Sequence, residues 1–276
     1  MADVSIVRCA SYDADECRVA PEAAIAAVGG LDWVRDGMKI AVKVNLVSAM
    51  RPEEAATVHP VLLTELVKLL HSRGASVVLG DSPGGLYTAA HLNHVYDVTG
   101  LRACEAAGAQ LNQNFAQAHG ENPAARQARH FQYTAWLDDA DAIIDFCKLK
   151  THGQIGMTCA VKNFFGTIPG TMKPEYHYKY PKIEDFADMI VASASISSPG
   201  SACATRSSAW RATDRRRGRR ARSALCSPQG APTRSTLPRR EYWALSRARC
   251  RRSPPPSTAG SAPRRRTRWT ILCSAT

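Results

Sequence analysis

The chain has 276 residues, of which 45% are hydrophobic, enough for a packed core in one large domain or two small ones. Its nine cysteines include no CxxC pair, which excludes a small disulfide scaffold. The formal net charge of +12 is uneven: residues 193–276 carry +17, whereas residues 1–192 carry −5. The basic charge therefore belongs to the tail and does not indicate nucleic-acid binding by the rest of the chain.

No uncharged apolar segment approaches the roughly 18 to 20 residues that a membrane span needs. The N-terminal sequence enters a strand-like pattern directly, without the basic and apolar regions of a secretory signal. We therefore expect a cytoplasmic protein without a membrane partner.

Residues 1–192 read as an α/β domain in which strand-like and helix-like segments alternate. The expected strands are residues 4–9, 39–47, 76–80, 110–115 and 142–148, and the expected helices are residues 21–34, 61–72, 101–107, 158–165 and 183–191. This alternation predicts a mostly parallel sheet with helices on both faces.

The periodic pattern stops after Ala192. The last 84 residues contain 19 Arg, 15 Ser and 8 Pro but no Lys, and no apolar face repeats along them. One interpretation is a largely unstructured basic arm, because low hydrophobicity and high charge oppose a packed core. Such an arm would bind nucleic acid non-specifically and with strong salt dependence.

A second interpretation of the tail is translation in the wrong reading frame, since GC-rich DNA read out of frame gives arginine without lysine. If the frame is moved by one base, residues 204–220 can encode D-A-I-V-G-M-E-G-N-G-P-T-A-G-T-P. We therefore expect a shift equivalent to a one-base deletion near Ala192, which would leave the domain at 1–192 incomplete; a product without function is one alternative.

The loop Asp81–Gly85 follows a buried strand, the position where open α/β sheets bind ligands. Its glycines would let backbone N–H groups approach an anion, and Asp81 could hold a hydroxyl group or a metal. A tight turn in which Asp81 caps the next helix would need the same residues.

Residues 148–170 contain several basic side chains and little acid. Lys148 and Lys150 end a strand, His152 follows in the loop, and Lys162 lies in the next predicted helix. Such a cluster suits a phosphate, carboxylate or enolate, with His152 able to exchange a proton near neutral pH. A solvated basic loop is the alternative.

Two further features concern the strand 39–47 and the cysteines. Lys43 and Asn45 alternate onto one face near the end of this strand, either as ligand-binding residues or as ordinary edge-strand positions. Cys147 and Cys159 flank the lysine segment, where they are either redox-active or small buried hydrophobic groups. No set of residues indicates a metal site.

The chain resembles the DUF362 family, a domain of unknown function often fused to a ferredoxin-like module with two [4Fe-4S] clusters. The resemblance rests on Lys43-Val44-Asn45-Leu46, Thr57-Val58-His59-Pro60, Gly80–Gly85, Lys148–Gly153, Ala160–Gly166, Ile168-Pro169-Gly170 and Tyr180-Pro181 with Asp185–Ala187. Val44 replaces the usual proline, and no CxxCxxCxxxCP run is present. The shifted G-M-E-G-N-G-P also resembles the family's next motif.

This resemblance implies a protein that binds an anionic small molecule at strand carboxyl ends and, in intact relatives, takes part in iron–sulfur electron transfer. No cofactor is expected from this chain itself. A weaker similarity of residues 152–170 to lactate-racemase-type proteins gives an acid/base enzyme as the alternative. The expected catalytic residues are His152, Lys162 and Lys150, and the expected ligand-binding residues are Lys43, Asn45, Asp81, Ser82, Gly84, Gly85, Lys148 and Asn163.

The frameshift hypothesis predicts that sequencing the encoding DNA across the codons for Phe186 to Trp210 will restore one base. The corrected frame should continue through G-M-E-G-N-G-P into a longer protein with a lower net charge. An unchanged DNA sequence would contradict a sequencing error and leave either a decayed gene or a genuine basic arm.

Overall fold

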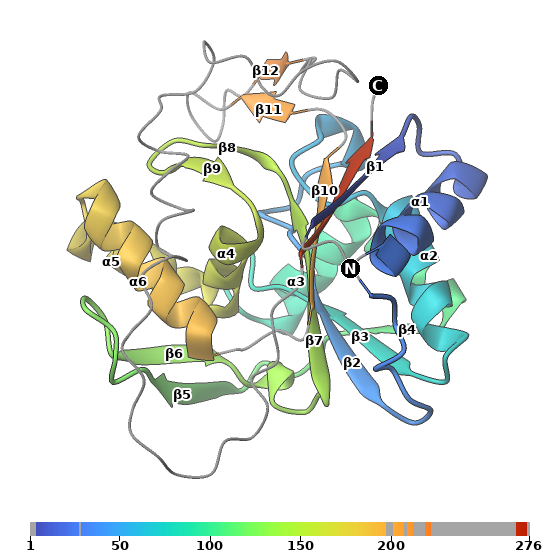
Figure 1. The fold of residues 1–276 in the computed structure, drawn as a ribbon. Coiled ribbons are helices and arrows are strands. Elements are labelled where there is room, and N and C mark those ends of the chain that lie inside the picture. The colour runs from blue at the N-terminus through green and yellow to red at the C-terminus, as the bar shows by residue number, and fades with distance from the viewer. Residues whose placement is uncertain are drawn as a thin grey trace.

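The computed structural model describes residues 4–27, 29–196, 201–206, 209–211, 219–221 and 269–274. Its centre is a seven-stranded sheet in the order β1-β13-β10-β7-β2-β3-β4, in which every neighbouring pair is parallel (Figure 1). The strands are β1 (Val4–Cys9), β2 (Lys39–Lys43), β3 (Ser76–Gly80), β4 (Ala109–Leu111), β7 (Ala142–Lys148), β10 (Ser201–Arg206) and β13 (Trp269–Ser274). The predicted parallel α/β fold is confirmed.

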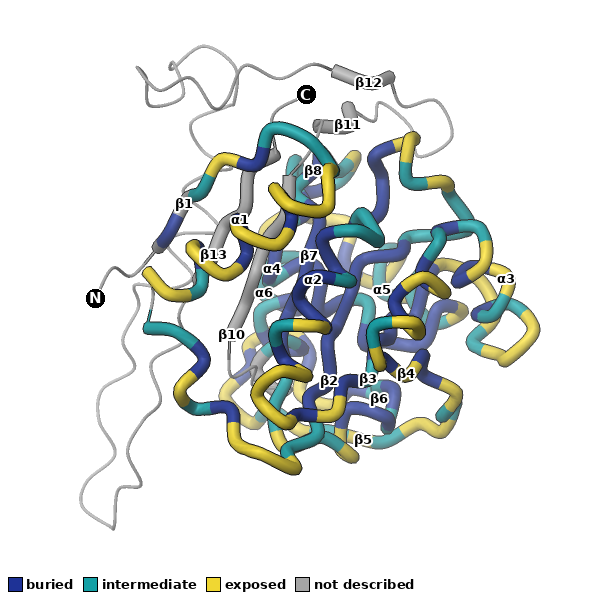
Figure 2. Tube along the Cα trace, turned by 90° about the vertical axis from the view of Figure 1, so that its right-hand side faces the viewer, coloured by how far each residue is buried: buried dark blue, intermediate teal, exposed yellow. Residues whose placement is uncertain are grey.

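Helices cover both faces of this sheet, as predicted. Figure 1 shows α1 (Ala14–Ala27) and α2 (Pro60–His71) on one face and α4 (Ala160–Asn163) and α6 (Ile183–Ile196) on the other. The first face also carries α3 (Ala89–Thr99), whose Leu92, Val95 and Tyr96 share one buried cluster with the leucines of α2. Figure 2 shows the buried strands enclosed between these layers.

Strand β2 shows how the pleat separates core residues from site residues. Ile40 and Val42 belong to the cluster under α1, α2 and α3, together with Ile144 and Phe146 of β7. Because successive side chains of a strand point to opposite faces, the interleaved Lys43 faces the other side of the sheet. The apolar cluster therefore fixes the strands, and the alternate positions are available for polar chemistry.

Several predicted elements differ in extent or type from those observed; for example, β4 spans Ala109–Leu111 instead of 110–115, and α4 spans Ala160–Asn163 instead of 158–165. Helix α1 begins at Ala14, seven residues before the expected start, because the Asp13 carboxylate accepts the backbone N–H groups of Asp15 at 2.9 Å and Glu16 at 3.4 Å. This cap outweighs Pro21, which the prediction had treated as a helix start. Strand β2 ends at Lys43 rather than residue 47, and residues 101–107 form a 3₁₀ helix.

Other elements were not predicted. Helix α3 lies where no helix was expected, and it is capped by Thr88 and ended by Gly100 at φ 73°. Two antiparallel hairpins, β5 (Gln117–Glu121) with β6 (His130–Thr134) and β8 (Lys150–His152) with β9 (Gly156–Thr158), extend from the main sheet. The 3₁₀ helices are Pro52–Glu54, Ala135–Leu137, Phe164–Thr167 and Gly170–Met172, and α5 spans Lys173–Lys179.

The tail contributes strands that the sequence analysis did not predict. Strands β10 and β13 join the main sheet, and β11 (Ala209–Arg211) pairs with β12 (Arg219–Ala221). The sequence of β13, WTILCS, is a short apolar run, which suits a strand covered on both sides. The rest of the tail lies outside the described residues, so its predicted lack of structure and the domain boundary at 192 stay predictions.

Within the described part of the chain, no helix is both long and apolar enough to cross a membrane.

Candidate functional site

A buried ion pair joins the ends of two neighbouring strands. Lys43, the last residue of β2, places its Nζ 2.7 Å from Oδ1 of Asp81, which directly follows β3, and both side chains are nearly inaccessible. The second carboxylate oxygen of Asp81 accepts the backbone N–H of Leu46 at 2.8 Å, and Oδ1 also accepts that of Ser82 at 2.9 Å. Since an isolated buried charge costs several kcal/mol, these partners are what permit Asp81 to be buried.

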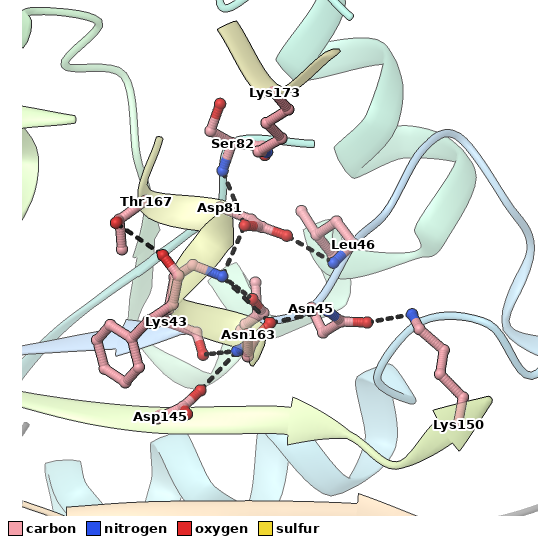
Figure 3. A network of polar contacts seen from close by, with 12 residues as sticks. Lys43, Asn45, Leu46, Asp81, Ser82, Asp145, Lys150, Asn163, Thr167 and Lys173 are labelled. Atoms are coloured by element: carbon pink, nitrogen blue, oxygen red, sulfur yellow. Dashed lines mark hydrogen bonds and ion pairs between the residues drawn. The ribbon is translucent and has the colours of Figure 1, made fainter. Parts of the chain in front are cut away.

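Asn163 of α4 connects this ion pair to β7. Its side-chain oxygen accepts hydrogen bonds from Asn45 at 2.8 Å and Lys43 at 3.3 Å. Its amide nitrogen donates to Oδ1 of Asp145 at 2.5 Å and to the backbone oxygen of Lys43 at 3.3 Å. Figure 3 shows the resulting network, in which one amide side chain links β2, β7 and α4.

Asp145 is the member of this network whose burial is least compensated by hydrogen bonds. Burial raises the pKa of its carboxyl well above the ordinary value, although the hydrogen bond from Asn163 and the charge of Lys43 act in the opposite direction. Its Oδ2 is buried and has no hydrogen-bond partner. That environment favours the neutral form of the carboxyl group.

The backbone of Val47, which follows the end of β2, is held in an unfavourable conformation beside this network. Val47 has φ 57°, a value that a β-branched residue rarely adopts, and its carbonyl accepts the N–H of Gly84 at 2.8 Å. Backbone strain of this kind costs about 1–3 kcal/mol and is concentrated at functional sites.

Gly166 is required by the close approach of the 3₁₀ helix Phe164–Thr167, which follows α4, to the ion pair. A Cβ atom at this position would lie 2.6 Å from Nζ of Lys43 and would also overlap the Asp81 carboxylate. The Gly166 carbonyl accepts the N–H of Ser82 at 3.0 Å, so the same residue also holds the loop after β3.

A cavity of about 100 Å³ opens next to this network. The loop after β3, the β8–β9 hairpin and the segment from α4 to α5 surround it. The cavity is lined by Asn45, Val47, Asp81, Ser82, Pro83, Gly84, Lys150, Thr151, His152, Gly153, Thr158, Lys162, Asn163, Phe165, Gly166 and Lys173. It therefore lies outside the carboxyl ends of β2, β3 and β7, where ligands bind in open α/β folds.

Three lysines line the cavity from three directions. Lys150 of β8 donates to the side chain of Asn45 and, at 2.5 Å, to the carbonyl of Ala56. Lys173, the first residue of α5, donates to the carbonyl of Ser82. Lys162 of α4 lies 4.3 Å from the centroid of the Phe165 ring, a cation–π geometry.

His152, at the end of β8, completes the polar lining. Its Nδ1 accepts the backbone N–H groups of Gln154 at 3.2 Å and Ile155 at 3.4 Å. A ring nitrogen that accepts carries no hydrogen, so the hydrogen of the neutral ring resides on Nε2. The imidazole of His177 is stacked 6.1 Å away at an interplanar angle of 10°.

The structure brings eight of the eleven predicted site residues to the cavity wall: Asn45, Asp81, Ser82, Gly84, Lys150, His152, Lys162 and Asn163. Lys43 lies behind the wall and is paired with Asp81. Gly85 and Lys148 lie off the wall, with Gly85 against the ring of His91 and the buried Lys148 close enough to influence His59. Asp81 lies in the cavity wall, and the alternative prediction that it caps the next helix is wrong: the cap of α3 is Thr88, and the Asp81 carboxylate instead accepts the N–H groups of Leu46 and Ser82.

Lys173 is the main lining residue that the sequence analysis missed. The sequence around it shows no pattern that indicates a ligand site, and its spacing does not relate it to the lysines of residues 148–162. Only the contact of α5 with the loop after β3 brings it to the cavity.

His59, which precedes Pro60 at the start of α2, is a structural residue. Its Nδ1 accepts the N–H of Val61 at the start of α2, and its ring stacks on Tyr12 with 3.5 Å between centroids. Burial, reinforced by the positive charge of Lys148, lowers the pKa of His59 to about 4. The histidine is therefore neutral in the folded protein near neutral pH.

The described residues contain no group of three or more His, Cys, Asp or Glu side chains that could hold a metal ion. Their cysteines approach one another only in pairs, Cys9 with Cys17 and Cys147 with Cys159. This part of the chain therefore offers no four-cysteine set for an iron–sulfur cluster.

A family model described as "Domain of unknown function (DUF362)" matches residues 40–215 of this chain. The chain belongs to the DUF362 family. The match contains every residue of the cavity wall and runs beyond Ala192 into the tail, where the frameshift stays a prediction.

Two known proteins are similar to this DUF362 chain. The "Thylakoid-associated protein sll1697" of Synechocystis sp. is 29% identical over 201 residues, which are 71% of this chain and 60% of that protein, so this chain matches less than two thirds of its relative's length. The lactate racemase apoprotein of Thermoanaerobacterium thermosaccharolyticum is 14% identical with a TM-score of 0.42, covering 70% of this chain and 48% of the racemase chain.

Removal of the Asp81 charge should destabilise the fold strongly. We expect Asp81→Asn to lower the free energy of unfolding by about 3–5 kcal/mol, because it leaves Lys43 as an unpaired buried charge. Asp97→Asn, which breaks the exposed pair with Arg102, is the matched control and should cost about 0–1 kcal/mol. Urea denaturation measures both. The double variant Lys43→Met/Asp81→Asn should be more stable than Asp81→Asn alone, and the opposite order would contradict the buried-charge explanation.

The neutral state of His59 should make folding stability depend on pH. Between about pH 6.5 and 4 the unfolded chain takes up a proton at His59 that the folded chain does not, so stability falls as the pH falls through this window. In His59→Asn, which keeps a capping side chain, the free energy of unfolding should decrease less over this pH range. Denaturation at pH 7, 5.5 and 4.5 measures the slope, with the exposed His119→Asn as control. Equal slopes in wild type and His59→Asn would contradict this role.

Proposed function

We propose that this chain binds a small anionic molecule, a phosphate, carboxylate or enolate, in the cavity at the carboxyl ends of β2, β3 and β7. The observation that carries this proposal is the charge of the wall. Lys150, Lys162 and Lys173 line the cavity, and Asp81 is the one acidic residue among its lining residues. The Asp81 carboxylate is already engaged by Lys43 and two backbone N–H groups.

The surroundings of the lysines support an electrostatic role. Lys150 donates to an amide oxygen and a backbone carbonyl, and Lys173 donates to a carbonyl, so these contacts orient both ammonium groups at the cavity wall. Positive charge concentrated in a partly enclosed space attracts an anion more strongly than the same charge in water.

The proposed role of His152 follows from its hydrogen bonding. With Nδ1 fixed as an acceptor of two backbone N–H groups, Nε2 carries the hydrogen and can donate to an anion in the cavity. We propose Lys150 and Lys162 as the residues that hold the negative charge and His152 as the residue that donates to it. Proton exchange by His152 would then require loss or weakening of the two backbone contacts.

A role in iron–sulfur electron transfer stays a prediction from the family resemblance. The matched relative extends beyond the part shared with this chain. A cluster-bearing partner or domain would have to supply the ligands, because the residues described here contain no suitable cysteine set.

The proposal predicts that one lysine can be removed with a loss of anion affinity and little change in fold. Lys162→Met keeps the aliphatic stem that packs beside Phe165 and removes the charge. We expect it to weaken binding of inorganic phosphate or malonate about tenfold or more, since a hydrogen bond to a charged group contributes about 1.5–3 kcal/mol. Titration calorimetry on the full chain measures the affinity.

Lys182→Met, at an exposed position away from the cavity wall, is the control and should bind like the wild type. It also corrects for binding of anions by the arginine-rich tail, which is identical in both variants. Equal affinities in Lys162→Met and Lys182→Met, or no saturable binding of either anion, would contradict the proposal.

A further inference from the structure

Two thiols face each other beside the cavity. Cys147 is the next-to-last residue of β7, and Cys159 is the residue that precedes the first turn of α4. Their sulfur atoms are 4.0 Å apart, and the Cys147 thiol donates to the sulfur of Cys159. Cys147 is buried, whereas Cys159 is partly exposed, so a reagent in solvent would meet Cys159 first.

The chain contains a second pair at the same distance, which makes a comparison possible. The sulfur atoms of Cys9 and Cys17 are also 4.0 Å apart, but both residues are buried. Burial raises the pKa of Cys17 to about 12, and it raises that of Cys9 as well. The distance between the sulfur atoms is therefore the same in the two pairs, while the exposure to solvent and the pKa of the thiols differ.

The thiol of Cys159, in the pair beside the cavity, loses its proton more readily than the thiols of Cys9 and Cys17. The hydrogen bond from Cys147 holds the pKa of Cys159 below its ordinary value, with help from the backbone N–H of Ala160 and against the effect of burial. The thiolate is the reactive form of cysteine, so Cys159 combines access with a larger reactive fraction.

We propose that Cys147 and Cys159 form a reversible redox pair, in which Cys159 is the attacking thiol and Cys147 the resolving thiol, with a small-molecule disulfide such as glutathione disulfide as oxidant. The sulfur atoms must approach from 4.0 Å to about 2.05 Å, which a rotation of the partly exposed Cys159 side chain can begin.

The chemistry balances in two exchange steps. The Cys159 thiolate attacks one sulfur of glutathione disulfide, forms a mixed disulfide and releases one glutathione thiolate. Cys147 then loses its proton, attacks the sulfur of Cys159 and releases the second glutathione. Two electrons pass from the protein to the oxidant, the two thiol protons end on two glutathione molecules, and one protein disulfide forms.

The bond would close a ring around the cavity wall. Residues 147–159 include Lys150, His152 and Thr158, which all line the cavity. Oxidation would thus tie the end of β7 to the start of α4 and restrict the hairpin between them. A ring closure of this kind also limits the unfolded chain, so the oxidised protein should melt at a higher temperature than the reduced one.

Peptide mapping of the full chain tests the proposal. The reduced protein is incubated with glutathione disulfide, free thiols are blocked by alkylation, and the protein is digested with trypsin. Cys147 and Cys159 fall in different tryptic peptides, 130–148 and 151–162, so their disulfide appears as a cross-linked pair. Cys9 and Cys17 share the peptide 9–18, in which a disulfide appears as the loss of two hydrogens.

We expect the 147–159 cross-link to form at least about tenfold faster than the disulfide within peptide 9–18, because the thiolate fraction of Cys17 is far smaller. Equal rates would overturn the assignment, since proximity alone would then be sufficient. Cross-links from Cys147 or Cys159 to a cysteine of the tail, or continued alkylation of both residues, would also overturn it.

Two variants separate the roles of the thiols. Cys147→Ser should accumulate a stable glutathione adduct on Cys159, because the resolving thiol is missing. Cys159→Ser should show no oxidation at Cys147. The reverse pattern would overturn the assigned order of attack. Cooperative melting of each variant establishes that it is folded, and the wild-type peptide map tests the pair even if one variant does not fold.

Discussion

The ion pair between Lys43 and Asp81 is the interaction on which the site depends. Two charges removed from water are stable only when their hydrogen-bonding capacity is satisfied, and here backbone N–H groups and Asn163 supply the remaining partners. The pair therefore joins the ends of β2 and β3 to α4. It also leaves space for nothing larger than a hydrogen atom at Gly166, so the 3₁₀ helix Phe164–Thr167 can approach the ion pair closely.

This arrangement divides the lysines of the region into two groups. Lys43 is paired with Asp81 behind the wall, whereas Lys150, Lys162 and Lys173 line the cavity. Without the internal pair, the Asp81 carboxylate would compete for those lysines with the anion that we propose as the ligand. The buried pair thus stabilises the fold and, under that proposal, also favours binding of the anion.

The two cysteine pairs illustrate the same dependence on surroundings. Cys9 with Cys17 and Cys147 with Cys159 have equal sulfur–sulfur distances, yet burial opposes ionisation at the first pair, while a hydrogen bond and partial exposure favour it at the second. The second pair also lies on the segments that carry the cavity lysines. Chemistry at these sulfur atoms would therefore act on the cavity wall directly.

The sequence by itself determined the class of fold and much of the wall. Strands Val4–Cys9, Ser76–Gly80 and Ala142–Lys148 were predicted with their observed bounds. The last two are short apolar runs of the kind that buried parallel strands need, whereas Val4–Cys9 was recognised by its alternating pattern. Alternation along β2 likewise separated Lys43 from the core, and the glycine-rich loop after β3 marked the ligand end of the sheet.

Only the tertiary structure decided which polar residues meet. Lys173 reaches the cavity through the packing of α5, and Asn163 bridges Lys43 and Asp145 across 120 and 18 residues of sequence. The start of α1 and the existence of α3 depended on single capping contacts, from Asp13 and Thr88, that outweighed weak local propensity. Pairing between distant strands decides whether a lysine is buried beside a carboxylate, as Lys43 is, or lies at the cavity wall. No local pattern in the sequence contains that information.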